Sequence, residues 1–150
     1  MTQTAASERY LLGRLTVLER RVEVAVQRRR RTDPAPADAF RGLYLSDHHV
    51  DRLLSEPEAS RIEIDDGEAT KLEALVEGEA DTATEAGSTV RLRRVISGFD
   101  LTALDVDLLL AALAPDLDAR FEKLYGYLHD DVSRRRASIG LAIEIGRAHV

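Results

Sequence analysis

An apolar seam in the first 31 residues is the feature that most limits how this chain can fold. The seam residues follow one another at alternating steps of four and three: Leu11, Leu15, Leu18, Val22 and Ala25. That spacing keeps apolar side chains on one face of a helix, so we predict one long helix over residues 7–31. Two interpretations stay open: an amphipathic helix packed on its own domain, or a coiled-coil or subunit-contact helix. The first is favoured because about two heptads are fewer than a stable coiled coil needs.

A proline-rich break follows this helix. Residues 32–36 read TDPAP, and proline donates no backbone hydrogen bond and disfavours a helical conformation of the residue before it. We therefore predict a linker over residues 32–38 and a second, helical unit over residues 39–143.

The first half of that second unit gives weaker signals. Ser46 is expected to cap a short helix, and the alternating pattern of residues 61–65 allows one short strand. Residues 72–76 form a helical stripe. The polar stretch ADTATEAGS at residues 80–88 is predicted to be a loop.

The second half has a clearer pattern. A helical stripe occupies residues 92–99, and Gly98 can end that helix. Thr102 and Asp105 have the spacing of a capping box, which opens the nearly all-apolar segment LDVDLLLAALA. Such a segment is typical of a central, buried helix, and we expect Pro115 to end it.

Helical spacing then resumes towards the end of the chain. Asp116 is expected to start the next helix, and Asp130 and Asp131 to mark its polar end. The inner face of that helix carries Phe121, Leu124, Tyr125 and Leu128. Ser138 is expected to cap a final helix that begins at Ile139. Taken together, these elements predict a mainly α fold.

Several classes of protein are excluded by what the chain lacks. It has no cysteine, which excludes disulfides, thiolate metal sites and cysteine nucleophiles. The longest apolar run, Leu108–Ala114, is far shorter than the roughly 20 residues that cross a bilayer, and the N-terminus lacks the pattern of a signal peptide. We therefore expect a cytoplasmic protein without a membrane partner.

No motif indicates catalysis, a cofactor or a metal ion. The sequence contains no P-loop, no G-x-G-x-x-G and no H-E-x-x-H. Neighbouring side chains on a helix point about 100° apart, so His48 and His49 do not converge on one ion. Residues 129–131 are interpreted as a polar helix end, and Ser138 has no base near it in the sequence. We therefore predict no catalytic, cofactor-binding or metal-binding residue.

Charge is unevenly distributed along the chain, whose net charge is −6. Residues 1–31 hold eight arginines against three glutamates, whereas residues 32–100 hold seven basic and sixteen acidic residues. Two arginine clusters supply the candidate interaction residues: Arg28, Arg29, Arg30, Arg31, Arg134, Arg135 and Arg136. Ion pairing within the chain or with another subunit is favoured, because nucleic-acid-binding domains are usually basic overall. Contact with nucleic acid stays open as the less favoured alternative.

Three segments resemble the N-terminal region of a group of bacterial AAA-type ATPases. They are residues 99–118 (FDLTALDVDLLLAALAPDLD), residues 124–136 (LYGYLHDDVSRRR) and residues 40–46 (FRGLYLS). Some members of that group are encoded with contractile injection systems. Ala137 departs from the pattern, which usually has proline after the arginines.

The resemblance implies a winged-helix-like domain that precedes an ATPase module. The expected fold is then a long N-terminal helix followed by a helical, winged-helix-like bundle with at most a short strand pair. The domain would be non-catalytic and would contact other subunits of a homo-oligomeric ring, a protein substrate or an adaptor. ATP and Mg²⁺ would bind to the parent protein's ATPase module, beyond this fragment. The alternatives are a winged-helix nucleic-acid-binding regulator and a helical oligomerisation module.

The last seven residues have an unusual origin on this interpretation. Residues 144–150 read EIGRAHV, which resembles the translation of a common short-read sequencing adapter. We predict that the native sequence continues differently after Ile143, and that His149 has no functional role.

Overall fold

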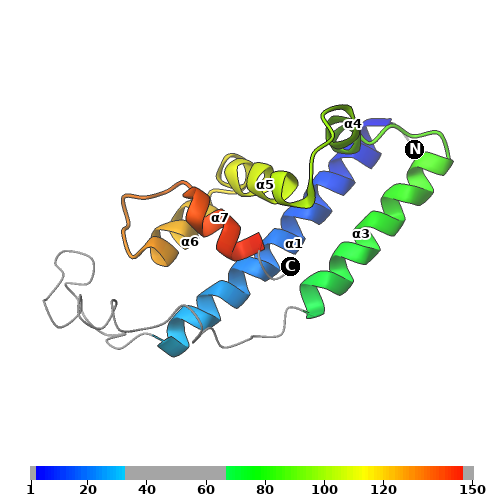
Figure 1. Ribbon diagram of the computed structural model, residues 1–150. Coiled ribbons are helices and arrows are strands. Elements are labelled where there is room, and N and C mark those ends of the chain that lie inside the picture. The colour runs from blue at the N-terminus through cyan, green and yellow to red at the C-terminus, as the bar shows by residue number, and fades with distance from the viewer. Residues whose placement is uncertain (1–2, 33–66, 147–150) are drawn as a thin grey trace, which may run out of the picture.

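The computed structural model describes residues 3–32 and 67–146 (Figure 1). Its helices are α1 (Gln3–Thr32), α3 (Gly67–Glu85), α4 (Arg91–Gly98), α5 (Ala103–Leu117), α6 (Arg120–His129) and α7 (Ile139–Gly146). These two ranges contain no strand, so the predicted mainly α fold is confirmed. The expectations for Ser46, for His48 and His49 and for a strand at residues 61–65 lie outside the described residues.

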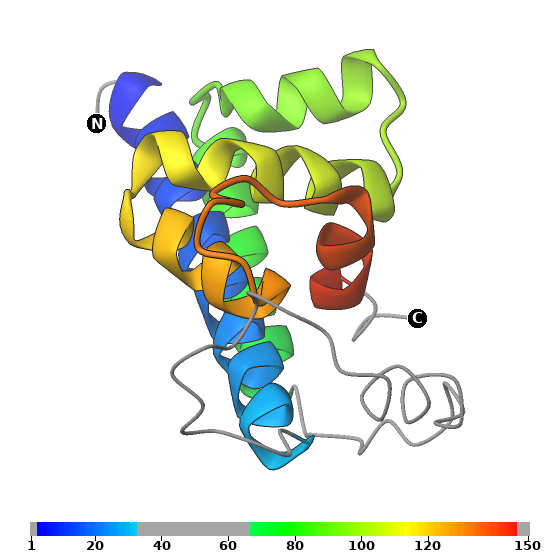
Figure 2. The same ribbon diagram turned by 90° about the vertical axis from the view of Figure 1, so that its left-hand side faces the viewer.

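The long helix α1 is the axis around which the other helices are arranged. Helix α3 runs antiparallel along one side of α1, while α5, α6 and α7 pack on another side (Figure 1). Helix α4 lies near the N-terminal end of α1. Figure 2 shows the same arrangement from the side of the shorter helices, with α5, α6 and α7 in front of α1. Each of the other helices within the two described ranges contacts α1.

The predicted apolar seam of α1 lies inside the domain's own core. Four of its residues are buried and Leu11 is partly buried. The core they enter contains Leu15, Leu18, Val22, Ala25, Val106, Leu110, Ala114, Phe121, Tyr125, Leu141 and Ile145. These residues come from α1, α5, α6 and α7, so the interpretation of an amphipathic helix packed on its own domain is confirmed.

A second, smaller core joins α1 to α3. It is formed by Ala6, Tyr10, Val17, Val76, Ala80 and Val90. Gly13 lets the two helices approach closely, because a Cβ atom built on it would lie 2.8 Å from Cγ2 of Val76. The long helix therefore has two buried apolar faces, one towards α3 and one towards α5, α6 and α7.

Helix α5 confirms one prediction at its start and corrects another at its end. Thr102 and Asp105 form the predicted capping box, in which the backbone N–H of each residue donates to the side chain of the other. Pro115 was expected to end the helix, but α5 continues through it to Leu117. The carbonyl that Pro115 leaves without a helical donor belongs to Ala111, and the buried hydroxyl of Tyr125 donates to it at 2.8 Å.

Two further boundaries differ from the predictions. Residues 80–88 were expected to form a loop, but α3 extends to Glu85, and the burial of Ala80 against α1 favours this extension. The Thr82 and Thr84 hydroxyls donate to carbonyls one turn earlier. Asp116 does not start a helix. It lies in the last turn of α5, and α6 begins at Arg120, whose backbone N–H donates to the Asp118 carboxylate.

The remaining predictions around α4, α6 and α7 hold. Helix α4 ends at Gly98 as expected, although only Leu92 and Ile96 of its stripe pack against the core. Asp130 ends α6 in the left-handed conformation, with φ of 57°. The Ser138 hydroxyl accepts a hydrogen bond from the backbone N–H of Leu141 at 3.1 Å, as a helix cap should.

Candidate functional site

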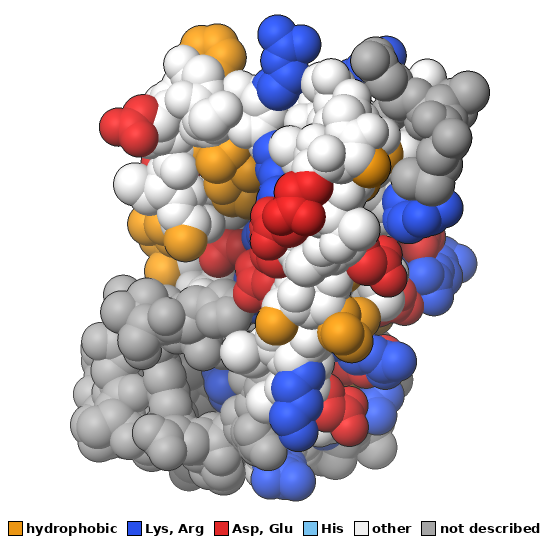
Figure 3. Space-filling view, turned by 90° about the vertical axis from the view of Figure 1, so that its right-hand side faces the viewer, with side chains coloured by type: hydrophobic (Ala, Val, Ile, Leu, Met, Phe, Trp, Pro, Cys, Tyr) orange, Lys and Arg blue, Asp and Glu red, His pale blue; other side chains and the backbone are white. Residues whose placement is uncertain are grey.

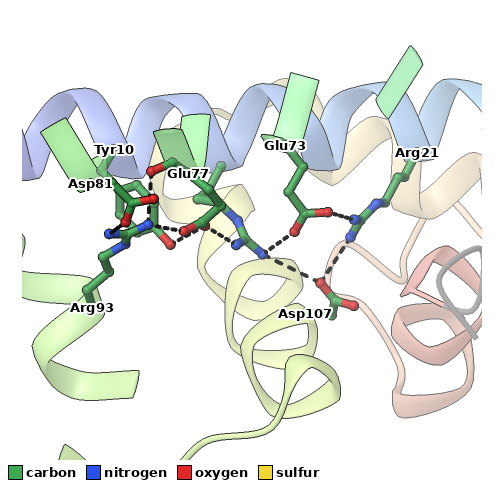
Figure 4. Close-up of polar contacts among 8 residues, drawn as sticks. Tyr10, Arg21, Glu73, Glu77, Asp81, Arg93 and Asp107 are labelled. Carbon is green, nitrogen blue, oxygen red and sulfur yellow. Dashed lines mark hydrogen bonds and ion pairs between the residues drawn. The ribbon is translucent and has the colours of Figure 1, made fainter. Parts of the chain in front are cut away.

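A line of buried charges separates the two cores of α1. Arg14 and Arg21 lie two turns apart on this helix and are 8% and 3% exposed. An arginine can be buried at low cost only if carboxylates accept its hydrogen bonds, because a charge without partners is strongly disfavoured in a protein interior. Those carboxylates come from helices on both sides of α1 (Figure 4).

Arg21 joins α1 to both neighbouring helices. Its Nη1 donates to Oδ1 of Asp107 on α5 at 3.0 Å, and its Nη2 donates to Oε2 of Glu73 on α3 at 2.8 Å. Arg14 reaches Glu73 at 3.1 Å and Glu77 at 2.8 Å. Glu73 is therefore shared by both buried arginines (Figure 4).

The network continues towards the N-terminal end of α1, where it becomes more exposed. The hydroxyl of Tyr10 donates to Glu77 at 2.6 Å, and Arg93 of α4 pairs with Glu77 and Asp81 of α3. The Arg93 guanidinium also lies over the Tyr10 ring, 5.4 Å from its centroid. This end of the network ties α4 to the α1–α3 pair.

The pKa values in this network follow from its hydrogen bonds. Burial would raise the pKa of the Glu77 carboxyl, but hydrogen bonds from Tyr10 and the two arginines outweigh burial and hold the pKa below its usual 4.5. Burial and the neighbouring carboxylate raise the pKa of Tyr10. The network thus keeps charged carboxylates and a protonated phenol in place, an arrangement suited to holding helices in register.

This network was not predicted from the sequence, although two signals in the sequence point to it. Arg14 and Arg21 are one heptad apart beside the apolar seam, and Asp107 is a charged residue that follows the capping box in the otherwise apolar segment of α5. Neither signal names its partners, because Arg21 and Asp107 are 86 residues apart in the sequence. Within the described ranges, no three His, Asp or Glu side chains are placed to hold a metal ion.

The arginines of the first predicted cluster, residues 28–31, have different surroundings in the structure. Arg29 is anchored to α6: it donates to the Leu128 carbonyl at 3.0 Å, pairs with Asp130 at 3.4 Å and lies over the Tyr127 ring. Arg28 is only partly exposed. Arg30 and Arg31 are exposed on the last turn of α1 and pair with no residue that the structure describes.

The second cluster lies in the segment between α6 and α7, where each arginine has a carboxylate partner of the same chain. Arg136 makes two hydrogen bonds to Asp116, at 2.8 and 2.9 Å. Arg135 lies 3.9 Å from Glu122. Arg134 lies 3.7 Å from Asp131. The three arginine side chains are 65%, 68% and 58% exposed, in chain order, so these pairs are at the surface.

One pair that spacing in the sequence did not reveal lies in the same segment. His129 Nε2 is 3.0 Å from the Ser138 hydroxyl oxygen and also accepts from the Ser138 backbone N–H at 3.4 Å. The backbone N–H can only donate, so Nε2 is the acceptor and the Ser138 hydroxyl can donate to it. The contact therefore links the end of α6 to the start of α7.

Helix α3 is acidic, with six carboxylate residues and one lysine. Figure 3 shows acidic side chains over the middle of the face that carries α3. A shallow groove lies between α3 and the start of α1, with an apolar floor that includes Ala6, Tyr10 and Ala80 and a rim that includes Arg9 and Glu79.

Comparison with known protein families assigns the chain to one of them. Residues 5–147 match the family described as "Winged helix domain, variant". The chain belongs to this winged helix family. No curated protein and no solved structure matches it. The winged-helix part of the predicted resemblance is therefore confirmed, while the connection to AAA-type ATPases stays a prediction.

The family match treats α1 as part of the winged helix domain, as its packing does. The matched residues include nearly all of α1 together with α3 to α7, which agrees with the packing of each of these described helices on α1. None of the described helices combines the length and apolar character that crossing a bilayer requires.

Proposed function

We propose that this winged helix domain is a non-catalytic, protein-contacting part of an AAA-type ATPase. It would contact other subunits of a homo-oligomeric ring, a protein substrate or an adaptor. ATP and Mg²⁺ would be bound by a separate module of the parent protein. Support comes from family membership and from the resemblance of residues 99–118 and 124–136 to the region that precedes such a module.

The main observation in favour of a protein partner is that the arginines of the second cluster form ion pairs with carboxylates of their own domain. Arg134, Arg135 and Arg136 each lie beside a carboxylate of their own domain. A nucleic-acid phosphate would have to displace these carboxylates on a chain of net charge −6. A protein surface with carboxylates of its own can instead exchange partners with the exposed pairs one at a time. Mixed surface charge therefore favours a protein partner.

Two experiments test the proposal. Long-read sequencing of the locus beyond the codon for Ile143 should reveal a P-loop motif in the same frame within the following few hundred codons. The purified 150-residue chain should hydrolyse no ATP in the presence of Mg²⁺. An open frame without a nucleotide-hydrolysing module, or ATP turnover by the chain itself, would overturn the proposal.

A second candidate, a nucleic-acid-binding regulator, is favoured by one specific observation. Arg30 and Arg31 are exposed and have no ion-pair partner among the described residues. A mobility-shift titration of duplex DNA at two salt concentrations distinguishes the candidates, since phosphate contacts weaken steeply with added salt. The second candidate requires salt-sensitive binding that R30Q/R31Q lowers and R20Q, at a position already paired with Glu23, leaves unchanged. Absent binding or a flat salt response removes it.

A further inference from the structure

The segment between α6 and α7 ends in a serine that three arginines precede. Residues 134–138 read RRRAS, so the arginines lie two, three and four positions before Ser138. Ser138 is exposed, and Ile139, directly after it, is 74% exposed. None of residues 134–138 belongs to a helix. An incoming protein can therefore reach the serine and its flanking side chains together.

The arginines are available to such a protein because their present partners are weakly held. Exposed ion pairs contribute about 0–1 kcal/mol each, since water competes with both charges. The pairs of Arg134 and Arg135 are also long, at 3.7 and 3.9 Å. A groove lined with carboxylates can take over these guanidiniums through two-pronged hydrogen bonds.

We propose that Ser138 is a phosphorylation site for an arginine-directed serine/threonine kinase. Kinases select substrates by complementary charge around the acceptor hydroxyl, and arginines on its N-terminal side match an acidic substrate groove. In the reaction the Ser138 oxygen bonds to the γ-phosphorus of Mg-ATP, and the bond from that phosphorus to the β,γ-bridging oxygen breaks. ADP leaves, and the hydroxyl proton passes to the carboxylate base of the kinase.

The groups around Ser138 can stabilise a phosphoserine at this position as well as the unmodified serine. The serine oxygen already accepts from the Leu141 N–H at the start of α7, and phosphate oxygens at a helix start are stabilised by its free N–H groups and dipole. His129 Nε2 lies 3.0 Å from the same oxygen, and in the tautomer that carries its proton on Nε2 the ring can donate to the phosphate.

Phosphorylation would change the surface of this segment. A phosphate adds about −1.5 to −2 charges at pH 7 beside the arginines. It competes with Asp116 for Arg136, whose two hydrogen bonds now tie the segment to the end of α5. The segment then presents an acidic rather than a basic group to a partner. This inference does not depend on the proposed ATPase parentage.

The test uses the intact chain, Mg-ATP and the catalytic subunit of cAMP-dependent protein kinase as the arginine-directed enzyme. Peptide mass spectrometry should find phosphate on Ser138. All variants carry T32A as well, because Thr32 also directly follows a run of arginines, residues 28–31. Ser133 is the matched control, because it lies in the same exposed segment but before the arginines. In this background S133A should accept phosphate as T32A alone does, and S138A should accept none.

A second variant keeps the test decisive if S138A weakens the cap of α7. R134Q/R135Q leaves the serine and its hydrogen bonds in place and should lower kcat/KM for phosphorylation about tenfold or more, because two charge-assisted contacts are lost. Circular dichroism would verify that each variant is folded. In the T32A background, no phosphate on the folded chain, phosphate retained in S138A, or an unchanged kcat/KM in R134Q/R135Q would each overturn the proposal.

Discussion

The hydroxyl of Tyr125 on α6 completes the hydrogen bonding of Ala111 on α5. The two groups are 2.8 Å apart and buried, and the Ala111 carbonyl is the one that would accept from residue 115 if residue 115 were not proline. Burial raises the pKa of Tyr125, which keeps this donor protonated. A proline inside α5 is therefore tolerated because a side chain of another helix replaces the missing backbone donor.

Replacing Tyr125 with phenylalanine should test this relationship. The substitution Y125F leaves a buried carbonyl without its donor, which should lower the free energy of unfolding by about 1–3 kcal/mol. The same substitution in a P115A background should cost much less, since residue 115 then supplies a backbone N–H. Urea unfolding of the two single variants and the double variant measures the difference. Equal costs in both backgrounds would show that the hydroxyl has another role.

Adjacent arginines on α1 offer a matched comparison of buried and exposed charge. Arg21 is 3% exposed and joins Asp107 and Glu73, whereas Arg20 pairs with Glu23 at the surface. We expect R21M to destabilise the domain by about 3–5 kcal/mol, because two carboxylates lose a partner in a buried site. R20M should change stability by about 0–1 kcal/mol. Thermal and urea unfolding monitor both, and similar effects would contradict a buried network.

Stability at acid pH should depend on Glu77. Its pKa is lower in the folded chain than the usual 4.5, so the folded state binds fewer protons than the unfolded state in the acid range. The stabilisation is complete above the unfolded pKa and is lost as the pH falls through the folded pKa. We expect E77Q to be less stable at neutral pH and to lose less stability on acidification.

The measurement for Glu77 is urea unfolding from about pH 6 to about pH 3, where the linkage term acts. E79Q is the control, because Glu79 is an exposed carboxylate on the same helix. A pH slope as steep in E77Q as in the unmodified chain would show that other carboxyl groups account for the acid sensitivity.

Two glycines should respond in opposite ways to the same substitution. A Cβ on Gly13 would lie 2.8 Å from Val76, so G13A should be destabilising, since overpacking a close contact costs about 1–3 kcal/mol. A Cβ atom on Gly78, inside α3, would lie more than 4 Å from every atom outside the adjoining turns of its own helix. G78A should stabilise by about 0.5–1 kcal/mol through helix propensity. Thermal unfolding tests both, and V76A should rescue G13A if the contact is the cause.

Local patterns in the sequence predicted most of the helices. The α1 seam and the capping box of Thr102 and Asp105 depend on residues within one or two turns of each other, so their spacing alone identifies them. The errors arose where a distant residue decides the outcome. Pro115 was expected to end α5 because the rule for proline considers the chain before it, not the Tyr125 hydroxyl ten residues later.

The candidate site likewise contains one part that the sequence predicted and one part that it did not. The pairing of the arginines between α6 and α7 with carboxylates of the chain was favoured from composition, and the structure supplies the partners. The buried network could not be predicted, because Arg21 meets Glu73 and Asp107 only when three helices pack together. A charged residue beside an apolar seam indicates that some partner exists but not where it lies.

The buried arginines also restrict how the helices can move. Sliding α1 by one turn past α3 or α5 would shift a guanidinium by about 5.4 Å, further than any hydrogen bond can stretch. Intermediate positions would take Arg14 and Arg21 away from Glu73 and Asp107 in a medium that solvates charge poorly. Any sliding of α1 against α3 and α5 would therefore have to break several buried ion pairs at the same time.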